Sequence, residues 1–99
     1  MPDNDSETLK LLGYALGDLQ DRYREMPPHE RAEFRPKLDE AFEAYQNFRI
    51  LLLSPGDIIT AADLDQMKAI GDEISAAADK QSLISGAIKL AGFARGFII

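Results

Sequence analysis

The 99-residue sequence contains no cysteine, no tryptophan and a single histidine. Without cysteine the chain has no disulfide bond and no thiolate nucleophile or metal ligand, so packing alone must hold its core. Acidic residues are absent from the last part of the chain. All seventeen Asp and Glu residues lie between Asp3 and Asp79, and the charged residues after Asp79 are all basic. The tail is therefore the unusual part of this sequence.

The charge of the chain is divided unevenly. Residues 1–79 contain seventeen acidic and eight basic residues, a balance of −9, whereas residues 80–99 contain three basic residues, a balance of +3, which together give the net charge of −6. A strongly acidic body repels nucleic-acid backbones and favours basic partners, so we expect no direct binding of nucleic acid. The first residues lack the basic start and apolar stretch of a secretory signal, which predicts a cytoplasmic location.

Apolar residues recur three and four positions apart in every long segment, and no segment alternates as a half-buried strand does. The sequence therefore predicts an all-α fold, a small antiparallel bundle of four helices that forms a single domain over residues 1–99. The predicted helices cover residues 5–25, 29–53, 61–79 and 82–98, and we expect a break in the second near Pro36. The third and fourth helices are near-continuous in sequence, but one rod would be too long for this domain, so we expect a bend between them.

Short motifs indicate where three of these helices begin. Asn4 followed by Glu7 is the expected cap of the first helix, and Ser82 is the expected cap of the fourth. Thr60 followed by Asp63 resembles a capping box at the start of the third helix, with Asp in place of the usual Glu.

The fourth predicted helix is apolar over most of its circumference when its residues are stepped at 100°. Such a helix can fill the centre of its own bundle, bind a protein through apolar surface that three neighbouring helices leave uncovered, or contact a membrane. Lys89 in the middle of the segment and Arg95 near its end disfavour spanning of a membrane. The apolar end of the sequence also fits an amino-terminal module of a longer chain.

We take protein binding through uncovered apolar surface as the leading hypothesis. The predicted partner is another protein or further copies of this chain in a homo-oligomer. The predicted partner-binding residues are Ile88, Lys89, Leu90, Gly92, Phe93, Arg95, Gly96 and Phe97.

Residues that could carry chemistry are few. His29 follows two prolines at a helix start, where exposure is the ordinary state, and no serine lies in a Gly-x-Ser-x-Gly motif. Carboxylate pairs such as Glu40 and Glu43 lack the histidines that a di-metal bundle needs. We therefore expect no enzymatic activity, no metal and no cofactor.

Two other functions stay open. The acidic body could make the chain a decoy that occupies the nucleic-acid groove of another protein, with carboxylates in the place of phosphates. A small enzyme is the less favoured alternative, because it would need a polar pocket around His29 or a carboxylate pair with strongly shifted pKa values.

Overall fold

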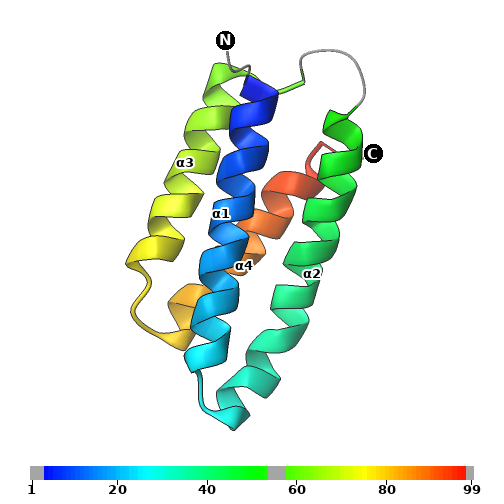
Figure 1. Ribbon diagram of the computed structural model, residues 1–99. Coiled ribbons are helices and arrows are strands. Elements are labelled where there is room, and N and C mark those ends of the chain that lie inside the picture. Colours follow the sequence, from blue (N-terminus) through cyan, green and yellow to red (C-terminus); the bar gives the residue numbers. More distant parts are fainter. Residues whose placement is uncertain (1–3, 54–57, 98–99) are drawn as a thin grey trace.

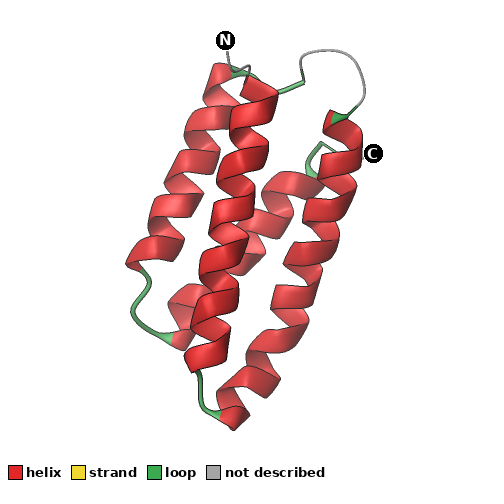
Figure 2. Cartoon of the chain, in the orientation of Figure 1, coloured by secondary structure: helices red, strands yellow, loops and turns green. Residues whose placement is uncertain are grey.

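The computed structural model describes residues 4–53 and 58–97, and these residues form four α-helices and no β-strand. The helices are α1 (Asn4–Glu25), α2 (Pro28–Leu52), α3 (Ala61–Ala76) and α4 (Lys80–Arg95). Figure 2 shows that short loops separate α1 from α2 and α3 from α4. Consecutive helices run in opposite directions (Figure 1), so the predicted antiparallel four-helix bundle is confirmed.

The four helices occupy the corners of a bundle in the order α1, α2, α4, α3. Close packing joins α1 to α2 and to α3, and it joins α4 to α2 and to α3, whereas α2 and α3 occupy opposite corners. Two neighbouring pairs therefore run in the same direction: α1 lies beside α3, and α2 lies beside α4 (Figure 1). This order places α4 between α2 and α3, with one side of the helix facing outward.

The core consists of the apolar stripes that the helical spacing predicts. An aromatic cluster forms where α2 meets α4, with the Phe48 ring 6.0 Å from the Phe93 ring and 5.4 Å from the Phe97 ring. Burial of Phe48 and of Phe93 stabilises the fold by roughly 1.5–3 kcal/mol for each side chain. The largest fully buried side chains come from all four helices: Leu12, Leu19, Phe34, Phe48, Met67, Ile74 and Leu90.

Helix α2 is continuous through Pro36, so the predicted break at this residue is wrong. Proline removes one backbone hydrogen bond and crowds the preceding turn. Phe34 and Leu38, which flank Pro36 in the sequence, are both buried in the core. Their packing holds the helix together on both sides of the proline.

The predicted helix starts are partly correct. The capping box of α3 is confirmed, because the Asp63 N–H donates to Thr60 Oγ1 at 3.1 Å and the Thr60 N–H donates to Asp63 Oδ2 at 3.0 Å. Asn4 does not act as the predicted cap, since it is the first residue of α1 and its Nδ2 donates to the Ile59 carbonyl. Ser82 is not the cap of α4 either, because its N–H donates to Oδ1 of Asp79, which is the true cap.

The bend between the third and fourth helices is also confirmed. Helix α3 ends at Ala76 and α4 begins at Lys80, and the molecule is 43 Å long. The observed ends differ from the predicted ends at residues 79 and 82. Helix α4 ends at Arg95, and the predicted end at residue 98 lies outside the described residues.

Two side chains of α1 hold α3 at its two ends. The buried carboxylate of Asp5 accepts hydrogen bonds from the N–H groups of Ile58 and Ile59, at 3.1 and 2.8 Å, just before α3 begins. At the other end, the Arg22 guanidinium donates to the carbonyls of Ser75 and Ala77 at 2.9 and 2.6 Å. Carbonyls at a helix C-terminus lack intrahelical partners, and a cation is a favourable donor to them.

Replacing Asp5 with Ala tests the first of these attachments. The change leaves two N–H groups without their charged acceptor, and we expect the free energy of unfolding to fall by about 2–3 kcal/mol. Urea denaturation measures this fall. The matched control is Asp39→Ala, which removes only an exposed ion pair with Arg35 and should change stability by less than about 1 kcal/mol. Equal losses in the two variants would contradict this role of Asp5.

Candidate interaction surface

Helix α4 turns most of its apolar residues inward, so the neighbouring helices cover more of its apolar surface than the sequence predicts. Gly86 shows why the helix fits, because a Cβ atom at this position would lie 2.6 Å from Cγ1 of Ile74 on α3. Small side chains allow two helices to approach closely. The buried residues of α4, four of them glycine or alanine, are Leu83, Gly86, Ala87, Leu90, Ala91, Phe93 and Ala94.

Three of the eight predicted partner-binding residues belong to the core rather than to the surface. Leu90 is completely buried and Phe93 is 6% exposed. Phe97 is half-buried, and its ring lies 5.2 Å from that of Phe93. An acidic residue in place of Phe93 would therefore unfold the bundle rather than only block binding.

The other five predicted residues lie together on the outer face of α4. Ile88 is 50% exposed, although it is a large apolar side chain, and Ile84 is half-buried one turn before it. Gly92 and Gly96 follow one and two turns after Ile88. The five exposed residues are Ile88, Lys89, Gly92, Arg95 and Gly96.

An ion pair between Lys89 and Glu73 bridges α3 and α4 on the outside of the bundle. The Lys89 ammonium donates to the two oxygens of the Glu73 carboxylate at 2.7 and 3.0 Å. Both side chains are about half exposed, so the pair contributes about 1 kcal/mol or less to stability. Its position matters more than its strength, because it divides the seam between the two helices into two hollows.

The first hollow has a volume of about 500 Å³, and the core residues Ile70 and Phe93 form part of its lining. It stays open because Ala69 and Gly92 carry little or no side chain, and no atom lies within 4 Å of a Cβ placed on Gly92. The second hollow, of about 440 Å³, lies beyond the ion pair and is lined by Glu73, Ala76, Ala77, Gln81, Ser82 and Ser85.

Helix α3 also contributes to this surface, which was not predicted from the sequence. Gln66, Ala69, Glu73 and Ala76 are all exposed and follow one another at spacings of three and four residues. Two alanines on a stripe that faces solvent are a detectable signal, because the outside of a surface helix ordinarily carries longer polar side chains. We call the exposed residues of α4 together with this stripe the α3/α4 face.

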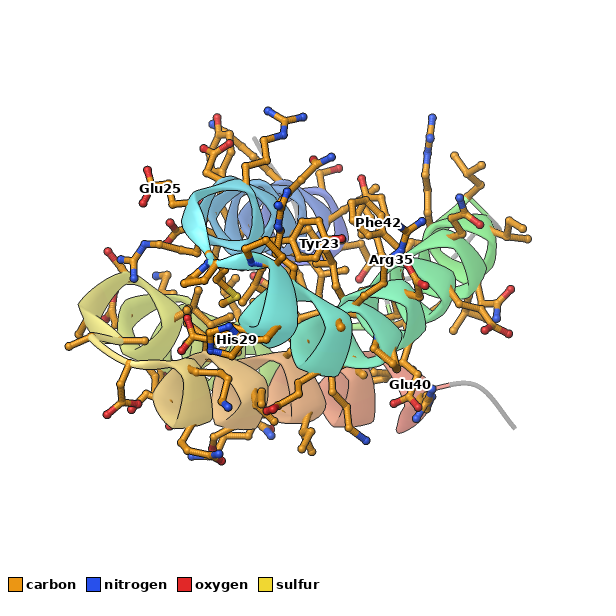
Figure 3. The ribbon with its side chains drawn as sticks, turned by 90° about the horizontal axis from the view of Figure 1, so that it is seen from below. Tyr23, Glu25, His29, Arg35, Glu40 and Phe42 are labelled. Atoms are coloured by element: carbon orange, nitrogen blue, oxygen red, sulfur yellow. The ribbon has the colours of Figure 1, made fainter. Side chains whose placement is uncertain are left out.

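His29 and Glu40, two of the residues considered for catalysis, do not converge. Figure 3 views the bundle from below and shows His29 in the first turn of α2, well apart from Glu40. Tyr23, Arg35 and Phe42 lie elsewhere in this view, between α1 and α2 (Figure 3). Within residues 4–53 and 58–97, no group of three or more His, Cys, Asp or Glu residues could hold a metal ion.

The shifted pKa values belong to structural contacts at the start of α4. A hydrogen bond from Lys80 and the charge of this ammonium lower the pKa of Glu33, and the same hydrogen bond raises the pKa of Lys80. The backbone N–H of Ser82 lowers the pKa of Asp79, which caps the helix. These shifts favour the charged forms of the three groups, whereas a general acid or base needs a pKa near the working pH.

Several acidic side chains on the surface form ion pairs with basic ones. Ion pairs join Arg24 to Asp21, Arg35 to Asp39 and Lys37 to Glu40 on α1 and α2. Further pairs join Lys80 to Glu33 and Lys89 to Glu73 between helices. The charges in the described part of the chain are thus of mixed sign, unlike the continuous acidic row that an imitation of nucleic acid requires.

Comparisons with models of protein families, with curated proteins and with solved structures found no match to this chain. Among the helices of the described residues, none combines the length and the apolar character that crossing a membrane requires.

Two glycines of α4 offer a matched test of which side of the helix is buried. Gly86→Ala forces a Cβ against Ile74, and we expect a loss of about 1–3 kcal/mol in the free energy of unfolding. Gly92→Ala meets open space, so the better helix propensity of alanine should raise stability by up to about 1 kcal/mol. Thermal and urea denaturation measure both changes. Losses of similar size in the two variants would contradict the division of α4 into an inner and an outer side.

Proposed function

We propose that this chain is a non-enzymatic, cytoplasmic protein-interaction domain that binds a protein partner or another copy of itself through the α3/α4 face. The observation that carries the proposal is the uncovered apolar surface on the outside of α4. Ile88 is half exposed there, beside a hollow through which Ile70 and Phe93 of the core can be reached. Exposed apolar patches with a polar rim are typical of protein interfaces.

The shape of the α3/α4 face favours a helix as the bound element. Gly92, Gly96 and Ala69 keep the surface low, which lets a second backbone approach closely. Gln66, Gln81 and the Glu73–Lys89 pair provide a polar rim. An amphipathic helix could place its apolar side chains in the two hollows at spacings of three and four residues.

The two rival functions receive less support. The mixed-sign surface speaks against a decoy, which would have to present carboxylates in a row. The separation of His29 from Glu40 speaks against an enzyme that uses the two together (Figure 3). Neither has an observation in its favour that matches the exposed Ile88 beside the hollow between α3 and α4.

Site-specific photo-crosslinking in the cell tests the proposal, because it captures a bound protein whatever its identity. A photo-reactive phenylalanine analogue replaces Ile88 in one variant and Ile50 in another, because both side chains are exposed and only Ile88 belongs to the α3/α4 face. We expect a discrete protein adduct, with a second copy or another protein, from position 88 and none from position 50.

The control is the change Gly92→Leu in the chain that carries the analogue at position 88. The bundle accommodates this leucine because the Cβ position is open, but its side chain occupies the hollow. The adduct should disappear while the helical circular dichroism spectrum is kept. The same adducts from positions 50 and 88, or no adduct from either, would reject the α3/α4 face as a binding surface.

A further inference from the structure

On the outer side of α4, residues are spaced symmetrically about Ile88, but their sizes are complementary rather than equal. The residues that share this side lie four and seven positions away: Ile84 and Gly92 at four, and Gln81 and Arg95 at seven. A bulky residue on one side of Ile88 is thus matched by a glycine on the other side. A surface whose two halves complement each other in this way is what a two-fold symmetric interface requires.

We infer that the α3/α4 face binds a second copy of this chain, with the two α4 helices antiparallel and the Ile88 side chains meeting on the two-fold axis. In this arrangement Ile84 of one copy lies over Gly92 of the other, so a bulky side chain enters the hollow that the glycine leaves open. Two large apolar residues, Ile84 and Ile88, lose solvent contact in each copy. This inference rests on the proposed function and names the partner of the same surface.

The charges of α4 fit the same arrangement. Lys80 and Lys89 are paired within the monomer with Glu33 and Glu73. Arg95 is exposed and makes no ion pair with any residue that the structure describes. The antiparallel arrangement places Arg95 opposite the uncharged Gln81 of the second copy and keeps the two Arg95 guanidinium groups far apart.

A parallel arrangement of the two helices would lose these advantages. Ile84 would meet Ile84, while Gly92 would face Gly92 across a gap without side chains. The two Arg95 guanidinium groups would also lie side by side, where like charges repel. Both size and charge thus favour the antiparallel dimer.

The lack of cysteine makes disulfide crosslinking a clean test, because the wild-type chain cannot crosslink. Under mild oxidation the Ile88→Cys variant should form a disulfide-linked dimer, since its two sulfur atoms meet on the axis. Ile50→Cys is the control, because Ile50 is 67% exposed and lies on α2. Ile84→Cys and Gly92→Cys should crosslink when the two variants are mixed, and much less when each is oxidised alone.

Sedimentation velocity over a concentration series supplies the second readout. The wild-type chain should approach twice its mass of 11.0 kDa. Gly92→Leu should raise the dimer Kd by about tenfold or more, which corresponds to about 1.4 kcal/mol. Crosslinking of Ile88→Cys no faster than that of Ile50→Cys, together with a monomeric wild-type chain, would overturn the dimer. Crosslinking of Ile88→Cys without the mixed crosslink would overturn the antiparallel register.

The outcomes also separate this inference from the proposed function. A monomeric chain that still gives a photo-adduct at position 88, sensitive to Gly92→Leu, rejects the second copy and keeps the binding surface. A monomeric chain without such an adduct rejects both. A dimer that forms equally well with Gly92→Leu rejects the α3/α4 face as its interface, because the leucine blocks the hollow that Ile84 must enter.

Discussion

The attachment of α3 to α1 at both ends is the constraint on which the arrangement of the other helices depends. The Asp5 carboxylate holds the backbone before α3, and the Arg22 guanidinium holds the carbonyls at its C-terminus. Each group has the charge that its end of α3 favours, negative where N–H groups are free and positive where carbonyls are free. With α3 fixed parallel to α1, the short connection at residues 77–79 leaves α4 only the remaining corner, between α2 and α3 (Figure 1).

The position of α4 explains how one apolar helix can serve both the core and a surface. Gly86 and the three alanines of α4 are buried, and close approach of the neighbouring helices buries Leu90 and Phe93 completely or almost so. The exposed side of α4 is narrow, with Ile88 at its centre and Gly92 and Gly96 toward its C-terminal end. The two roles use different sides of the helix, so binding at the exposed side needs no rearrangement of the core.

Much of the fold could be predicted because its signals are local. Spacings of three and four residues identified all four helices, and the Thr60–Asp63 capping box identified the start of α3. The attachments made by Asp5 and Arg22 could not be predicted, since their partners lie more than fifty residues away in the sequence. The continuity of α2 through Pro36 was missed for a related reason: tertiary burial of Phe34 and Leu38 outweighs the local penalty of proline.

The candidate surface was predicted only in part, for a reason that also lies in packing. Periodicity identifies an apolar helix but does not tell which of its sides the neighbouring helices cover, so Leu90 and Phe93 were placed on the surface with Ile88 and Gly92. The contribution of Ala69 and Glu73 depends on the pairing of α3 with α4, which the sequence does not specify.

The central claim is that one side of α4 is buried in the core and the other side is exposed. Its most direct test is to add a soluble paramagnetic agent to a dilute sample and measure how much it broadens the methyl NMR signals. The Ile88 methyl signals should broaden strongly and those of Leu90, two residues away, should stay sharp. Equal broadening of the two residues would mean that α4 has no buried side, which would contradict the account.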